Sequence, residues 1–164
     1  MRRHTVADFD QSAELWSDPD VVRYISGKPS TRAESWSRLL RYIGHWQALS
    51  FGYWVVEDRV TGQFLGEVGL ADYKRDMTPS IEQWPEIGWV LAPHAQGRGF
   101  ATEAVAAALD WSDRMLTADR TMCLMDPRHL ASIRVAAKNG FVECCSGELG
   151  GSPVLIMERR KPAT

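Results

Sequence analysis

The chain has 164 residues, of which 45% are hydrophobic, and a formal net charge of −2 at pH 7. This length predicts one domain spanning residues 1–164, and the composition is sufficient for a sizeable core. The nearly balanced charge gives no reason to expect nucleic acid or an anionic membrane as a partner.

Three further features narrow the class of protein. No apolar run approaches the ~20 residues of a membrane span, and no signal-peptide core follows the N-terminus. Three cysteines, Cys123, Cys144 and Cys145, are too few for a disulfide framework and fit a reducing compartment. No cysteine or histidine pair has metal-ligand spacing, so we expect no metal and a cytoplasmic protein.

The sequence of the N-terminal region predicts two helices. It predicts almost no strand before them, because residues 2–5 form only a short stub. Asp8 is a candidate N-cap for a helix over residues 9–18, and Pro19 ends that helix. Thr31 and Glu34 form a capping box before a helix over about 32–48. The apolar positions of this second helix are Leu39, Leu40, Ile43 and Trp46.

Beyond residue 50 the apolar pattern alternates between strand and helix spacing. It predicts strands at 53–57, 64–70, 86–91, 121–125, 141–144 and 153–158, and helices over about 99–116 and 132–138. The last two strands are joined by a turn containing Gly147, Gly150 and Gly151. Glycines at 66 and 69 inside a strand indicate that another backbone or a ligand lies close. The order of elements predicts an α+β or mixed-sheet α/β domain.

One stretch carries a ligand-binding pattern, Gln96-Gly97-Arg98-Gly99-Phe100-Ala101-Thr102. It lies between the strand that ends at Leu91 and a long helix. Glycine lets the backbone approach a ligand closely, and the first N–H groups of a helix have no partner within the helix. The positive end of the helix dipole lies behind them, which favours a phosphate. The alternative is a tight strand-to-helix turn that binds nothing.

The pattern differs from the common nucleotide motifs. The chain has no Gly-Lys-Ser/Thr and no third glycine at the Rossmann spacing. The pattern Gln-x-x-Gly-x-Ala, here Gln96, Gly99 and Ala101, instead resembles the acyl-CoA signature of the Gcn5-related N-acetyltransferases (GNAT). The wider run from Pro85 to Ala104 is similar to the branch that acetylates ribosomal-protein N-termini (RimJ/RimL-like).

The resemblance covers most of the chain. Further motifs that resemble the branch are Asp18-Pro19-Asp20-Val21, Gly66-x-Val68-Gly69-Leu70 and the block from Ser132 to Phe141. The resemblance implies a strongly twisted mixed sheet that splits into a V and is flanked by about four helices. It also implies acetyl-CoA as co-substrate, with the pantetheine adding to a strand edge inside the V.

Two residues depart from the family pattern. His129 stands where the family has asparagine, and histidine cannot reproduce amide hydrogen-bond geometry. Ala136 occupies the position at which many members carry a tyrosine general acid, so a tyrosine acid at this position is excluded.

The resemblance implies a set of residues around the co-substrate. The diphosphate would bind backbone N–H groups from Gly97 to Thr102, and the strand from Trp89 to Leu91 would pair with the pantetheine. The N–H of Leu91 or Val90 would face the thioester oxygen. The complete cofactor set is Trp89, Val90, Leu91, Gln96, Gly97, Arg98, Gly99, Phe100, Ala101, Thr102, His129 and Ser132.

Acetyl transfer to an alkylammonium requires a base and an acid. Glu86, at the start of the cofactor strand, is the first candidate base; the alternative is an exposed charge at a strand end. Glu67 is the second, because its glycine neighbours would open space beside it. Ser132 is the candidate acid by resemblance, with His129 donating directly or through it; the alternative is a capping serine.

We interpret the reaction as direct attack in a ternary complex, because Cys123 lies on a core strand and is a poor candidate for an acyl-cysteine intermediate.

The acceptor remains open between peptide α-amines, among them protein N-termini, polyamines and amine antibiotics. Asp72, Asp76 and Glu82 are compatible with a cationic acceptor. A non-catalytic acyl-CoA sensor on the same fold is the alternative function, and an interaction domain whose glycine turn binds nothing is a third. Seven tryptophans make a homodimer plausible without establishing an interface.

Overall fold

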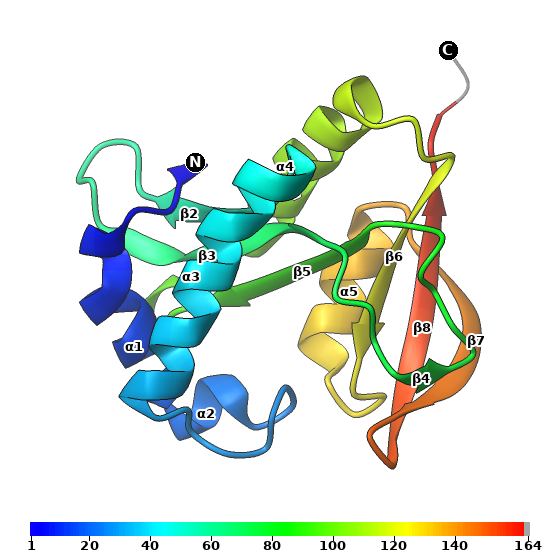
Figure 1. The fold of residues 1–164 in the computed structure, drawn as a ribbon, viewed down its shortest axis with the longest axis horizontal. Coiled ribbons are helices and arrows are strands. Elements are labelled where there is room, and N and C mark those ends of the chain that lie inside the picture. Colours follow the sequence, from blue (N-terminus) through cyan, green and yellow to red (C-terminus); the bar gives the residue numbers. More distant parts are fainter. Residues whose placement is uncertain (163–164) are drawn as a thin grey trace.

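The computed structural model describes residues 1–162, which form one eight-stranded mixed sheet and five α-helices (Figure 1). The strands are β1 (Arg2–Arg3), β2 (Tyr53–Glu57), β3 (Phe64–Ala71), β4 (Met77–Thr78), β5 (Glu86–Leu91), β6 (Arg120–Met125), β7 (Val142–Leu149) and β8 (Ser152–Arg160). The helices are α1 (Phe9–Ser17), α2 (Pro19–Val22), α3 (Arg32–Leu49), α4 (Phe100–Met115) and α5 (Leu130–Lys138), with 3₁₀ turns η1 (Val6–Asp8) and η2 (Pro93–Ala95). The sheet order is β1-β2-β3-β5-β6-β8-β7-β4, which confirms the mixed α/β class. Among the helices described, none is both long enough and apolar enough to cross a membrane.

The N-terminal stub is an edge strand. Arg2 and Arg3 pair with Val55 and Trp54 of β2, so the sheet has a first strand of only two residues. The capping role predicted for Asp8 is wrong, because its carboxylate accepts hydrogen bonds from Arg2 and Thr5 and does not cap α1.

Helix α3 has the predicted capping box, in which the Thr31 hydroxyl accepts from the backbone N–H of Glu34 at 3.2 Å. Its buried stripe includes Tyr42, which was not predicted, and Ile43 is only half-buried. Leu40 is 45% exposed, whereas Leu39, Tyr42 and Trp46 are buried. The buried face therefore follows the α-helical spacing of 3 and 4 residues from Leu39.

Helices cover both faces of the sheet. Val55, Phe64 and Val90 pack against apolar side chains of α1 and α2. The neighbouring strand positions, such as Trp54, Leu65 and Leu91, belong to a second cluster that includes Val105 and Ala108 of α4. The alternation follows from the two-residue period of a strand, and it places small residues of α4 close to the sheet.

The glycines of β3 make room for neighbouring backbone. Gly66 has φ +149°, and a Cβ there would lie 2.2 Å from the carbonyl oxygen of Val90. A Cβ on Gly69 would lie 2.2 Å from the Cα of Tyr53. The close neighbour predicted from these glycines is therefore the adjacent strand, and no space opens beside Glu67 for a ligand.

The sheet splits between β5 and β6. Strand β5 pairs antiparallel with β3 along its whole length, but it pairs with β6 only at Glu86 and Met122. Beyond this bridge the two strands diverge (Figure 1). The edge of β5 that faces the gap therefore lacks a neighbouring strand from Gly88 onward, which is the V that the family resemblance implied.

The C-terminal hairpin is longer than predicted. Strands β7 and β8 run to a tight turn at Gly150 and Gly151, both with positive φ, whereas Gly147 lies within β7 rather than in the turn. The segment between β3 and β5 contains the short strand β4, which pairs with β7.

Candidate active site

A cleft of about 990 Å³ lies at the split in the sheet. Residues from α3, the loop after β3, strand β5, the end of β6, the start of α5 and the β7–β8 turn line it. Of the residues predicted from the sequence, the cleft brings together Glu86, Trp89, Val90, His129 and Ser132. Concave sites in which polar groups converge are the expected location of small-molecule binding, and the polar groups fix the orientation of the ligand.

The backbone before α4 presents unpaired amides. Among residues 1–162, no hydrogen bond is donated by the backbone N–H groups of residues 97–102, and the first helical bond runs from Glu103 to the carbonyl of Gly99 at 3.1 Å. Gly97 and Gly99 have φ +72° and +88°, and no atom lies within 4 Å of where their Cβ would be. The segment therefore has both the donors and the open space that an anion requires.

Two side chains of this segment have structural contacts. The Gln96 side chain donates to the carbonyl of Leu91 at 2.9 Å, which ties the glycine loop to the end of β5. Arg98 is exposed, and its guanidinium lies 4.9 Å from the ring centre of Phe100. The motif glutamine thus fixes the position of the loop relative to β5.

The pairing of β5 decides which amides face the gap. Ala92 donates to the carbonyl of Leu65, and hydrogen-bonded pairs alternate along an antiparallel ladder. Val90 therefore bonds β3, whereas Trp89 and Leu91 direct their N–H groups to the opposite edge. This pairing rules out Val90 as the amide facing the thioester and leaves Leu91 from the predicted pair.

Glu86 is buried and paired. Its two carboxylate oxygens accept hydrogen bonds from Arg75 at 2.5 and 2.7 Å, and the residue is 7% exposed. The alternative of an exposed strand-end charge is therefore wrong. Each oxygen keeps a second lone pair, so the carboxylate can still bind a water or an ammonium group from the cleft. Arg75 is not predicted from the sequence, because nothing in its loop sequence distinguishes it from a solvated arginine.

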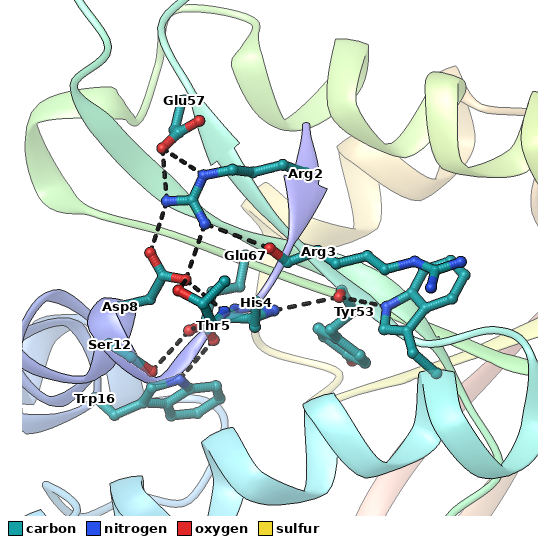
Figure 2. A network of polar contacts seen from close by, with 11 residues as sticks. Arg2, Arg3, His4, Thr5, Asp8, Ser12, Trp16, Tyr53, Glu57 and Glu67 are labelled. Atoms are coloured by element: carbon teal, nitrogen blue, oxygen red, sulfur yellow. Dashed lines mark hydrogen bonds and ion pairs between the residues drawn. The ribbon is translucent and has the colours of Figure 1, made fainter.

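Glu67 lies away from the cleft. Figure 2 shows its carboxylate enclosed by groups from the N-terminal segment and α1. It accepts from Ser12 Oγ at 2.7 Å and from Trp16 Nε1 at 2.9 Å, and one oxygen lies 3.3 Å from His4 Nε2. The residue is fully buried and all of these contacts are internal, so the structure contradicts the predicted base role.

Ser132 and His129 meet at the start of α5. Ser132 Oγ lies 3.5 Å from His129 Nε2, and the imidazole stacks on Tyr24 with ring centres 5.0 Å apart. Burial lowers the pKa of His129 below its usual value, and the nearby Asp126 carboxylate only partly opposes this. The ring is therefore neutral at pH 7, which makes His129 a poor primary acid and favours a supporting hydrogen bond to Ser132.

The cysteines do not contribute to the cleft. Cys123 is buried in β6, where burial raises the pKa of its thiol, and Cys144 and Cys145 lie on β7 outside the cleft lining. A buried thiol with a raised pKa is a poor nucleophile, in agreement with direct attack.

Comparisons with known proteins agree with this geometry. The model of the acetyltransferase (GNAT) domain family matches residues 1–142. The uncharacterized protein YkkB of Bacillus subtilis (strain 168) is 31% identical over 168 residues, which cover 98% of this chain and 92% of YkkB.

Two solved structures share the fold. A putative GnaT-family acetyltransferase from Bordetella pertussis is 30% identical with a TM-score of 0.84, covering 96% of this chain and 93% of that one. The spermidine N-acetyltransferase of Vibrio cholerae, solved with CoA and spermine, is 22% identical with a TM-score of 0.77, covering 98% and 94%. With a split mixed sheet, a glycine loop with unpaired amides, and this family match, the chain belongs to the GNAT acetyltransferase family.

Proposed function

We propose that this protein is an acetyl-CoA-dependent N-acetyltransferase that acetylates a primary amine by direct attack in a ternary complex. The observation that carries the proposal is the row of unpaired amides at residues 97–102, next to the open edge of β5. In a member of the GNAT family this arrangement fits a CoA diphosphate and a pantetheine arm.

The residues present divide the tasks of binding and activation. The amides from Gly97 to Thr102 bind the diphosphate, and the free backbone groups of Trp89 and Leu91 hold the pantetheine. The N–H of Leu91 donates to the thioester oxygen and stabilises the charge that develops there. Acetyl-CoA supplies an acetyl group activated as a thioester.

The proton steps fall to groups on opposite sides of the cleft. Glu86 accepts the proton of the acceptor ammonium, directly or through a water, which leaves the amine free to attack. The new C–N bond forms as the C–S bond breaks. The Ser132 hydroxyl donates a proton to the departing sulfur and regains one from the acylated nitrogen, directly or through a water. His129 hydrogen-bonds to the Ser132 hydroxyl and holds it in position.

An acetyltransferase and a non-catalytic CoA sensor require different groups in the cleft. A CoA sensor needs the amides but no proton-handling groups, whereas Glu86 and Ser132 both line this cleft. A relative from Bacillus licheniformis, 27% identical over 145 residues that cover 86% of this chain and 77% of the relative, is named an uncharacterized N-acetyltransferase. These observations favour the enzyme. A protein N-terminal α-amine, which the RimJ/RimL-like motifs imply, stays a prediction, as does a homodimer.

The proposal is tested by titrating acetyl-CoA calorimetrically and by measuring CoA release with a panel of amines and N-terminal peptides. We expect acetyl-CoA to bind, and CoA to be released with at least one amine.

Glu86→Gln is expected to lower kcat about 100-fold. The control Glu82→Gln, an exposed carboxylate outside the large cleft, keeps full activity. Absence of acetyl-CoA binding would contradict the proposal, and binding without turnover of any amine would favour the sensor.

A further inference from the structure

The charges in the cleft are mostly neutralised by the protein itself. Six basic and four acidic side chains line the cleft. Three of the acids are paired with a neighbouring base, in the ion pairs Lys74–Asp72, Arg75–Glu86 and Arg128–Asp126. Arg23 pairs with Asp20 just outside the cleft. The charged lining residues left without an ion pair, among residues 1–162, are the half-buried Arg38 and the exposed Arg41 and Asp76.

The two unpaired arginines lie on one face of α3. Arg38, Arg41, Tyr42 and His45 all line the cleft, and their spacing of 3, 4 and 7 residues places them along one side of the helix. The Arg38 guanidinium lies 3.7 Å from the ring centre of Trp16, and that of Arg41 lies 4.9 Å from the ring of Tyr73. Aromatic rings thus hold both planar groups in place without neutralising their charge.

Arg38 has hydrogen-bonding capacity to spare. Its Nη2 donates to Ser30 Oγ at 3.2 Å, whereas its Nη1 is buried without a partner among residues 1–162. A buried donor without an acceptor destabilises the protein unless a water or ligand supplies one, and arginine is suited to bidentate binding of carboxylate or phosphate.

The position of Arg38 in the cleft indicates that an anionic group bound there belongs to the acceptor and not to CoA. Arg38 stacks on Trp16, which packs with Val90 on the face of the sheet covered by α1 and α2. The glycine loop leads into α4, which packs on the other face. Arg41 is connected to the proposed base, because Tyr73 also contacts Arg75, the partner of Glu86.

From this arrangement we infer that the acceptor amine also carries an anionic group, a carboxylate or a phosphate, which binds Arg38 and Arg41 while the amine faces Glu86. The inference rests on the proposed function and narrows it to zwitterionic acceptors. It disfavours polyamines and polycationic antibiotics, because their additional charges would meet two guanidinium groups that are paired with no carboxylate of residues 1–162.

The experiment compares matched acceptors with and without the anion. CoA release is measured with α-amino acids and their carboxamides, with O-phosphoethanolamine and ethanolamine, and with spermidine. We expect kcat/KM at least tenfold higher for an anionic member of a pair, and the two pairs distinguish carboxylate from phosphate. Arg38→Gln and Arg41→Gln are expected to abolish the preference chiefly through KM, with acetyl-CoA affinity unchanged.

Arg23→Gln is the matched control, since this arginine also lines the cleft but is paired with Asp20. It is expected to retain the preference. Arg38→Lys keeps the charge but not the planar fork, so an intermediate preference is expected. Thermal melting of each variant shows whether it folds.

A second readout separates this inference from the proposed function. Calorimetry measures binding of N-acetylated amino acids and of an N-acetylated phosphoethanolamine, in the presence of CoA, to the protein and its arginine variants. Binding that depends on Arg38 and Arg41 supports the anion site even if no amine is turned over.

Turnover that is equal with and without the anion, or best with spermidine, overturns the inference but not the proposed acetyltransferase function. Loss of CoA affinity in Arg38→Gln with an unchanged acceptor preference also overturns it, and absence of both turnover and anion binding overturns both proposals.

Discussion

Two buried glutamates, Glu67 inside β3 and Glu86 at the start of β5, have different environments. Glu67 is surrounded by donors from the N-terminal segment and α1, whereas Glu86 faces the cleft and is paired with one arginine. The physical difference is access, because a base must reach its substrate or a water that does. Burial alone therefore does not indicate a catalytic carboxylate, and the direction in which the side chain points decides its role.

Glu67→Gln is expected to destabilise the protein without a proportionate loss of activity. The amide nitrogen would replace an acceptor oxygen and face a donor, which costs roughly 2–3 kcal/mol of unfolding free energy. Urea unfolding and steady-state kinetics measure the two effects. A fall in kcat comparable to that of Glu86→Gln, in a folded variant, would contradict the assignment of Glu67 to the scaffold.

Ser132→Ala is expected to lower kcat at least tenfold and to leave acetyl-CoA affinity unchanged, because the hydroxyl is proposed to donate the proton to the leaving sulfur. Full activity would remove the acid role.

An NMR titration of the unaltered protein is expected to place the pKa of His129 below 6.5, since burial disfavours its charged form.

At the scale of elements, the segment between β5 and α4 forms the proposed co-substrate site. Gln96 fixes the loop to Leu91, and the two glycines adopt positive φ that other residues rarely adopt. We propose that free backbone groups of the strand hold the pantetheine and that free amides at the start of the helix hold the diphosphate. The Gln96 hydrogen bond links these two parts of the proposed site.

Gly99→Ala is expected to weaken acetyl-CoA binding about tenfold, because the new methyl group strains a residue at φ +88° and occupies the open space beside the amides. Gly62→Ala is the matched control. This glycine has φ +71° and an equally open surrounding, but it lies in the β2–β3 turn. Calorimetry with acetyl-CoA compares the two. Equal affinity in both variants would argue against an anion cradle at Gly99.

At the scale of the molecule, a network of polar contacts fastens the N-terminal segment to the sheet. Arg2 bridges Asp8 and Glu57, and His4 lies beside Glu67 and the carbonyl of Tyr53 (Figure 2). The same network positions α1, whose Trp16 lies under Arg38 in the cleft. Stability of the N-terminal segment and geometry of the acceptor side are therefore connected.

The Asp8 contacts predict a specific dependence of stability on pH. Burial opposes ionisation of Asp8, but hydrogen bonds from Arg2 and Thr5 outweigh it and lower the pKa to about 2, from 3.8. Because the pKa is lowered on folding, the stabilisation is present above pH 3.8 and is lost as the pH falls towards about 2.

Asp8→Asn is therefore expected to lower the unfolding free energy by about 1–2 kcal/mol at pH 7, with a smaller difference from the unaltered protein near pH 2. Denaturant unfolding at several pH values measures this. A difference that stays constant down to pH 2 would show that the charge of Asp8 is not responsible.

The sequence alone determined the elements and the motif. Capping residues, glycine turns and apolar periodicity identified α3, α4 and the hairpin of β2 and β3, because these signals act over a few residues. Gln96, Gly99 and Ala101 identified the family for the same reason.

Only the tertiary structure decided which charged residues meet. The pairing of Arg75 with Glu86, the enclosure of Glu67 by Ser12 and Trp16, and the placement of Arg38 in the cleft all join segments distant in sequence. No local pattern reports such contacts, because they depend on how β5 and β6 separate and on which face of the sheet α3 covers. The roles of these side chains follow from their neighbours, and the neighbours are set by the fold.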